Sequence, residues 1–214
     1  MRSFNGTSPL SRSEQKKAQI LNAAIDLFCG QGFPNTSMDE VAKLAGVSKQ
    51  TVYSHFGSKD DLFVASIESK CVVHQVTAEL FTSPEQPEQA LLNFGNYFGE
   101  MIVSPEAIEV FKTCVAQADT HPEISELFFN AGPEFLLKLL EAYFEQVEKL
   151  GQYHFGDLRS AAVRLCMMLF GEMRLKLELG LPVDDLIANR SSYIQETVTM
   201  FLRAYRCQPF ADKR

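Results

Sequence analysis

The chain has 214 residues, of which 46 % are hydrophobic, and its net charge is −7. This length and composition suffice for a packed core and exclude an intrinsically disordered chain. The longest uninterrupted apolar stretch, residues 165–170, is far shorter than the about 20 residues that span a bilayer. No apolar run follows a basic segment near the start, so we expect a soluble, cytoplasmic protein without a signal peptide.

The charge is unevenly distributed along the chain. Residues 1–60 carry seven Lys or Arg and five Asp or Glu, a net +2, whereas the other 154 carry 13 and 22, a net −9. A mildly basic end on an acidic body suits a protein that touches nucleic acid with one end only. It argues against a protein that binds nucleic acid over its whole surface.

The cysteines and the missing catalytic motifs limit the chemistry. The five cysteines are far apart and form no Cys-x-x-Cys pair, so we expect reduced thiols, no disulfide framework, no metal site and no cofactor. The sequence lacks Gly-x-Ser-x-Gly, His-Glu-x-x-His, P-loop, Gly-x-Gly-x-x-Gly and Glu-x-x-His motifs. We therefore expect no enzyme, and a thiol sensor stays open as an alternative.

Hydrophobic periodicity predicts an all-α fold. Apolar residues recur at helical spacing throughout, and no strand alternation or hairpin turn is present. Glycine and proline separate the segments. Helices are predicted over residues 13–30, 37–45, 49–56, 58–81, 87–103, 105–118, 122–130, 133–150, 156–180 and 184–206.

Residues 36–57 have the pattern of a helix-turn-helix. Ser37 and Glu40 form a capping box that starts one short helix. Gly46 suits the turn, since it adopts positive φ without a Cβ penalty, and Ser48 can cap the second helix. Residues near the start of such a second helix reach base edges in the major groove.

This segment resembles the TetR/AcrR family signature. The resemblance covers about residues 12–65 and combines the capping box, the glycine turn, Tyr53-x-His55-Phe56 and Ser58-Lys59-x-x-Leu62 in one register. It implies an N-terminal three-helix head and a larger helical body for effector binding and dimerisation. The corresponding ranges are a flexible arm over 1–11, a DNA-binding domain over 12–57 and a body over 58–214.

The resemblance also implies which residues contact double-stranded operator DNA. Gln50 and Ser54 depart from the residues usual in the family at these positions, so the operator cannot be inferred from relatives. Tyr53 also has an alternative role in packing the head. The implied DNA contacts are Thr36, Ser37, Ser48, Lys49, Gln50, Thr51, Tyr53, His55 and Lys59.

Two helical stripes near the end of the chain predict a homodimer interface. Their apolar residues recur at three- and four-residue or seven-residue intervals, as in paired helices, and family members resemble this in pairing two C-terminal helices per subunit. An intramolecular core is the alternative. The predicted interface residues are Leu158, Leu165, Met168, Glu172, Leu175, Ile187, Ile194, Val198 and Phe201.

Large apolar side chains of the central helices are candidates for an effector pocket. Such stripes usually form core, but the resemblance implies that some line a cavity for a small, largely apolar effector. The candidates are His74, Phe94, Tyr97, Phe98, Met101, Phe111, Cys114, Phe135, Met167 and Phe170.

The resulting hypothesis is a DNA-binding transcription regulator, with the repressor role implied by the family's usual behaviour. An effector in the body would change the separation of the two reading helices, and residues 58–81 would act as the lever. A ligand-binding protein whose head no longer reads DNA is the remaining alternative. The sequence does not distinguish repression from activation.

Overall fold

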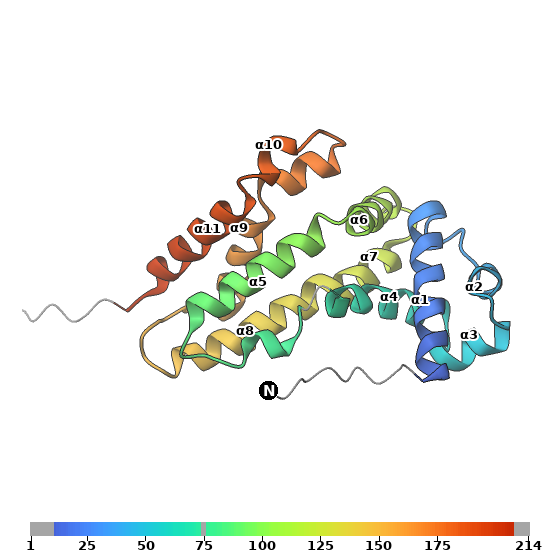
Figure 1. Ribbon diagram of the computed structural model, residues 1–214, viewed down its shortest axis with the longest axis horizontal. Coiled ribbons are helices and arrows are strands. Elements are labelled where there is room, and N and C mark those ends of the chain that lie inside the picture. Colours follow the sequence, from blue (N-terminus) through green and yellow to red (C-terminus); the bar gives the residue numbers. More distant parts are fainter. Residues whose placement is uncertain (1–10, 74–75, 208–214) are drawn as a thin grey trace, which may run out of the picture. The chain divides into compact units, whose positions relative to one another are not determined.

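The computed structural model describes residues 11–73 and 76–207, and all regular elements within these ranges are helices. Residues 1–10 of the predicted arm lie outside the described residues. The elements are α1 (Arg12–Gln31), α2 (Met38–Ala45), α3 (Lys49–Phe56), α4 (Lys59–Val73), η1 (Ala78–Phe81), α5 (Pro87–Ile102), α6 (Pro105–Gln117), α7 (Pro122–Phe129), η2 (Asn130–Glu134), α8 (Phe135–Glu148), α9 (Leu158–Glu178), α10 (Asp184–Ile187) and α11 (Arg190–Tyr205) (Figure 1).

The chain divides into two compact units between Ser66 and Ile67, within α4. In the first unit, α1 packs on α2 and α2 packs on α3. The rings of Phe28, Phe33 and Phe63 pack in mutual contact, with centroids 5.1–5.6 Å apart. This aromatic cluster packs α1, the loop after it and α4 against one another, and it forms part of the hydrophobic core of the first unit.

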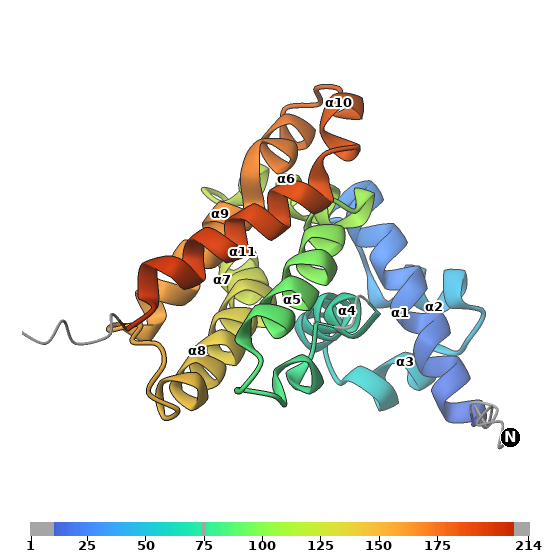
Figure 2. The same cartoon turned by 60° about the vertical axis from the view of Figure 1, so that its left-hand side comes forward.

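The core of the second unit lies among α5, α8, α9 and α11. The outer pair α9 and α11 run side by side, and α5 packs against both (Figure 2). Leu91, Leu140, Leu165 and Val198 are fully buried there, one from each helix. Burial of such side chains from four amphipathic helices is what holds this unit together.

The predicted helix over 58–81 is wrong as a continuous element. The structure has α4 ending at Val73 and a separate 3-10 turn, η1, preceded by Thr77 in an extended conformation. Val76 and Thr77 are β-branched, which lowers their preference for helix. The helix that is predicted to transmit movement from the body to the head is therefore shorter than expected.

The predicted helices over 156–180 and 184–206 are also divided. In α9, Gly171 has φ 59° and ψ −176°, a conformation that interrupts the helix and is open almost only to glycine. The Tyr193 hydroxyl donates to the carbonyl of Met168 beside this break. In the last segment, α10 is a short helix separated from α11 by residues 188–189.

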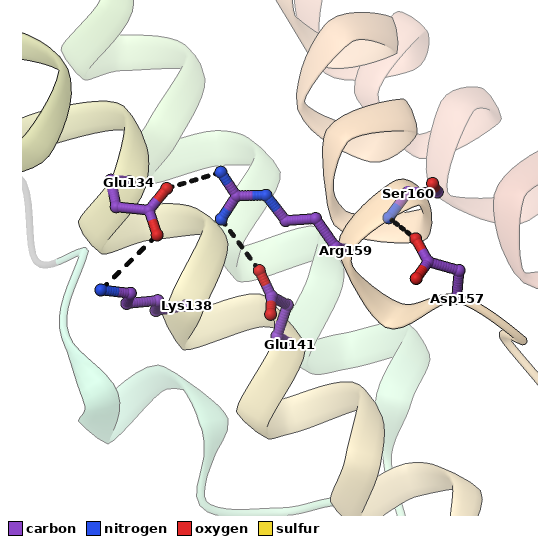
Figure 3. A network of polar contacts seen from close by, with 6 residues as sticks. All are labelled: Glu134, Lys138, Glu141, Asp157, Arg159 and Ser160. Atoms are coloured by element: carbon purple, nitrogen blue, oxygen red, sulfur yellow. Dashed lines mark hydrogen bonds and ion pairs between the residues drawn. The ribbon is translucent and has the colours of Figure 1, made fainter.

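A charged network fixes the start of α9 to α8 (Figure 3). The Arg159 guanidinium donates to Glu134 at 2.5 Å and to Glu141 at 3.0 Å, and Lys138 lies 3.5 Å from Glu134. The hydrogen bond from Arg159 holds the pKa of Glu134 below its usual value. Asp157 caps α9 by accepting from the Ser160 N–H at 2.7 Å.

Candidate nucleic-acid interface

The turn between α2 and α3 has the geometry of a helix-turn-helix. Gly46 ends α2 in the left-handed conformation, with φ 67° and ψ 32°, and its N–H donates to the carbonyls of Ala42 and Lys43. The Val47 N–H also donates to Ala42, at 3.0 Å. These bonds satisfy the last carbonyls of α2 and set the direction in which α3 leaves.

One face of α3 is exposed and polar. Lys49, Gln50, Tyr53 and Ser54 are exposed, whereas Val52 and Phe56 are buried in the first unit. Positions 49, 50, 53 and 54 recur at helical spacing, so they share one side of the helix. Tyr53 is 44 % exposed, which favours a role at the surface over the alternative role in core packing.

Lys49 is held by an acidic residue of α2. Its ammonium lies 2.8 and 3.0 Å from the two carboxylate oxygens of Asp39. It also lies 6.0 Å from the ring centroid of Tyr53. Asp39 was not among the predicted site residues, although a helix-turn-helix brings the first turn of one helix close to the start of the next.

The structure gives Thr36 and Lys59 internal partners. Thr36 is only 2 % exposed, and its hydroxyl donates to the carbonyl of Gly32 at 2.8 Å. The Lys59 ammonium donates to the carbonyls of Phe33 and Thr36, at 2.9 and 3.0 Å, and lies 4.3 Å from the Phe33 ring centroid. Two of the three ammonium donors are thus engaged within the protein.

Three more predicted contacts belong to helix caps. Ser37 and Glu40 form the expected capping box, and their hydrogen bonds hold the pKa of Glu40 below its usual value. Ser48 caps α3 by accepting from the Thr51 N–H, and the two hydroxyls lie 2.8 Å apart. The first turns of α2 and α3 still have backbone N–H groups without a partner inside the helix. Phosphates can bind to such groups at the N-terminal end of each helix.

The last predicted contact, His55, and its neighbour Ser54 complete this surface. His55 is half-buried beside Phe56, with ring centroids 6.1 Å apart. Ser54 lies on the exposed face of α3, and its hydroxyl donates to the Thr51 carbonyl at 2.8 Å. The exposed face therefore consists mainly of Lys49, Gln50, Tyr53 and Ser54.

The predicted pocket residues of the second unit differ in burial and in their neighbours. Phe94, Phe98 and Met101 are buried in the core, with Tyr97 packed against it, and Cys114 is also buried. Phe135 and Met167 are exposed, and His74 lies outside the described residues. The rings of Phe111 and Phe170 both contact the guanidinium of Arg174, whose central carbon lies 4.9 and 5.3 Å from their centroids.

Arg174 is a buried cation that sequence reasoning missed. It donates to Glu178 at 2.6 Å and to the carbonyl of Ile102. Its side chain is only 5 % exposed, so these partners compensate a charge withdrawn from water. Arg174 thus packs against two of the predicted pocket residues, Phe111 and Phe170.

A cavity of about 150 Å³ lies elsewhere in this unit, at the break in α9. It is smaller than the usual site for a drug-sized ligand. Among the predicted pocket residues that the structure describes, Phe170 alone contributes to its wall. Its lining comes from α5, α9, α10 and α11 and includes Gly99, Ile102, Phe170, Gly171, Arg190 and Tyr193.

The predicted dimer residues fall into two groups. Leu165, Ile194, Val198 and Phe201 are buried within the single chain, and Leu158 and Met168 pack against the same core. Glu172, Leu175 and Ile187 are exposed. Val163 and Met167 of α9 and Tyr193 and Met200 of α11 are also exposed, as is Leu179 directly after α9.

Neither a metal centre nor a membrane span is found in the described parts of the chain. Across residues 11–73 and 76–207, no cluster of three His, Cys, Asp or Glu side chains could hold a metal ion. In these same ranges no helix has the length and apolar character needed to cross a bilayer.

Two family models together match most of the chain. Residues 20–66 match the model described as bacterial regulatory proteins, tetR family. Residues 89–207, more than half of the chain, match the model described as AefR-like transcriptional repressor, C-terminal domain.

Curated relatives are similar to parts of the chain. The transcriptional activator FasR of Mycolicibacterium smegmatis is 40 % identical over 55 residues, 26 % of this chain and 25 % of FasR. The transcriptional repressor NicS of Pseudomonas putida is 28 % identical over 104 residues, 48 % of this chain and 49 % of NicS. The chain thus spans about a quarter to a half of the length of these relatives.

Solved structures are similar over nearly the whole chain. The flavonoid-responsive regulator FrrA is 30 % identical, with a TM-score of 0.70, and the match covers 92 % of this chain and 100 % of FrrA. A TetR-family transcriptional regulator from Mesorhizobium loti is 26 % identical, with a TM-score of 0.73 and coverage of 92 % and 100 %.

Proposed function

This chain belongs to the TetR family of bacterial DNA-binding transcription regulators, and on that premise we propose that it represses its target gene until a small-molecule effector releases it from the operator. One observation carries the DNA-binding part of this proposal. Lys49, Gln50, Tyr53 and Ser54 share an exposed face on the second helix of a helix-turn-helix. Side chains of these types bond base edges and phosphates.

The structure supports separate roles for the predicted DNA contacts. Lys49, Gln50 and Tyr53 are the reading residues, because they are exposed on α3. Ser37, Ser48 and Thr51 act near the phosphates through the helix ends that they cap. Thr36 and Lys59 act mainly by shaping the turn before α2, since their polar groups are engaged inside the first unit.

Gln50 offers a sharp test of the reading face. Gln bonds adenine through two hydrogen bonds in the major groove. Selection of operator sequences from random duplex DNA should give an adenine preference at one position of each half-site for the wild type. The Gln50→Ala variant should lose the adenine preference at this position and keep the wild-type base preferences at the other positions of the half-site. Selection of no sequence by the wild type would contradict the DNA-binding role.

Repression is supported by the description of the C-terminal family model and by the name of NicS, while FasR is named an activator. Repression predicts that deleting the gene raises transcription from the promoter that carries the selected operator. Lower transcription in the deletion strain would identify an activator instead.

A homodimer would present two α3 helices to one face of DNA, about 34–36 Å apart. Support comes from Met167 of α9 and Met200 of α11, whose side chains are 60 % and 56 % exposed. A Met167→Asp/Met200→Asp variant should sediment as a monomer, whereas Lys149→Asp, a change at an exposed residue after α8, should leave the dimer intact. A dimeric double variant would place the interface elsewhere.

The effector is proposed to bind in the second unit and to be small and largely apolar. Support comes from the aromatic side chains of this unit and from FrrA, whose name describes it as flavonoid-responsive. The chain contains no tryptophan, so Tyr97→Trp provides a single fluorescent reporter beside the core. Flavonoids are the first compounds to titrate.

Coupling between the two ligands is the test of the release mechanism. An effector that weakens operator binding must itself bind less tightly when operator is present, by the same factor. Coupling of the usual size corresponds to roughly 5- to 150-fold. A compound that shifts the fluorescence of the Tyr97→Trp variant but leaves its operator affinity unchanged would not be a releasing effector.

A further inference from the structure

Asp39 lies on the first turn of α2, and its carboxylate faces the first residue of α3. Both of its oxygens lie within 3.0 Å of the Lys49 ammonium. The Lys49 cation is thus paired within its own chain at the surface, and hydrogen bonding to Asp39 raises the pKa of Lys49. The ring of Tyr53, another residue of the reading face, lies 6.0 Å from the same ammonium.

This ion pair contributes little to the fold, because both side chains are well exposed to water. The pair matters more for how this surface would meet DNA. DNA presents a dense row of phosphates, and each free cation that meets it releases counterions and strengthens binding to any sequence. A carboxylate bonded to the cation cancels this gain and also repels the phosphates.

We propose that Asp39 is a specificity-determining residue of this DNA-binding surface, acting as a positioning residue for Lys49. Its carboxylate suppresses binding to DNA in general and holds the Lys49 ammonium where it reaches an acceptor at one base position of each half-site. Guanine offers such acceptors to lysine. The proposal rests on the proposed function of α3 as the reading helix.

The test compares wild type, Asp39→Asn, Lys49→Met and the double variant on two duplexes. One duplex is the operator that the wild type selects from random DNA, and the other has the same composition in scrambled order. In Asp39→Asn the ratio of operator to scrambled affinity should fall about tenfold, within the range that one misread base pair costs. The slope of log affinity against log salt on the scrambled duplex should steepen by about 2 for a dimer, since each Lys49 becomes a free cation.

Selection with each variant identifies the base position concerned. Asp39→Asn and Lys49→Met should relax the same position, and the double variant should relax it no further, because both changes act on one contact. Asp39→Glu, which keeps the charge, should restore the wild-type salt slope. Asp26→Asn, a matched change of charge at an exposed residue of α1, should leave both the ratio and the slope unchanged.

The outcomes separate this proposal from the one on which it rests. An Asp39→Asn variant with the wild-type ratio and slope, or one that relaxes a different position from Lys49→Met, would overturn the role of Asp39 alone. A wild type that selects no sequence would overturn the reading function and the role of Asp39 with it. If Asp39→Asn melts early, Lys49→Met and Asp39→Glu still report the base position and the slope.

Discussion

The Lys59 ammonium donates a hydrogen bond to the main-chain carbonyl of Thr36, 3.0 Å away, and so ties the start of α4 to the turn that precedes α2. A second bond to Phe33, at 2.9 Å, strengthens the link. Since the capped start of α2 follows this turn directly, any movement of the first turn of α4 acts on α2. A residue that resembles a phosphate contact in the sequence is therefore also part of the internal frame of the first unit.

Lys59→Met should remove these bonds while keeping a similar side-chain length over the Phe33 ring. Hydrogen bonds to a charged group are worth about 1.5–3 kcal/mol, so the free energy of unfolding should fall by roughly this amount. Chemical denaturation followed by circular dichroism measures it. Lys16→Met, at an exposed position of α1, is the matched control. Equal stability of the two variants would show that the Lys59 bonds contribute nothing in solution.

Gly46 should be sensitive to substitution for reasons of backbone conformation alone. Its φ is +67°, and a Cβ built there meets no atom within 4 Å. Gly46→Ala should therefore cost about 1–2 kcal/mol of stability through the left-handed backbone, whereas Gly46→Asn should cost less because Asn tolerates that conformation. Urea denaturation of the two variants compares them. An alanine variant as stable as the wild type would contradict the strained turn.

The helix-turn-helix could be predicted well from the sequence because its signals are local. Capping residues, the glycine turn and the buried Val52 and Phe56 each act within a few positions of the chain, and the structure places α2 and α3 at the expected residues. The role of Lys59 could not be predicted in this way. Its partners lie 23 and 26 residues earlier, so the contacts depend on how the unit packs.

In the second unit, hydrophobic periodicity predicts which helix faces are apolar but not what those faces contact. Apolar stripes on α9 and α11 predict contact faces, but they do not say whether a face meets the same chain or a partner, and Ile194 and Phe201 are buried within one chain. Similarly, Phe111 and Phe170 were predicted to line a pocket. Their rings contact Arg174, whose long charged side chain gives no apolar signal in the sequence, and Phe170 also lines the cavity at the break in α9.

Two cysteines should be slow to react in the folded protein. Burial raises the pKa of Cys114 to about 11 and that of Cys166 to about 12. Because the thiolate is the reactive form, iodoacetamide at about pH 8 should label exposed Cys207 well before either of them. Mass spectrometry of timed samples gives the order, and a denatured sample is the control. Rapid labelling of Cys166 in the folded protein would favour the alternative that the protein is a thiol sensor.

The Glu134–Arg159 pair should make stability depend on acid pH. The pKa of Glu134 is held down in the folded protein, so its contribution is present above its ordinary value of about 4.3 and is lost as the pH falls through the folded value. Glu134→Gln should lower the Tm at neutral pH, and the difference from the wild type should shrink below about pH 4. Glu145→Gln, which removes an exposed pair with Lys149, should show a smaller effect. A Tm difference that stays constant with pH would rule out the ion pair as its cause.

Binding of the purified protein to the DNA that flanks its own gene, measured over a series of salt concentrations, tests the central claim most directly. The wild type should bind this DNA tightly and saturably, with an affinity that falls as salt rises. A Lys49→Ala/Tyr53→Ala variant, altered only on the exposed face of α3, should fold and lose this binding. If the double variant binds the same fragment as tightly as the wild type, α3 is not the reading helix and the account given for this surface is wrong.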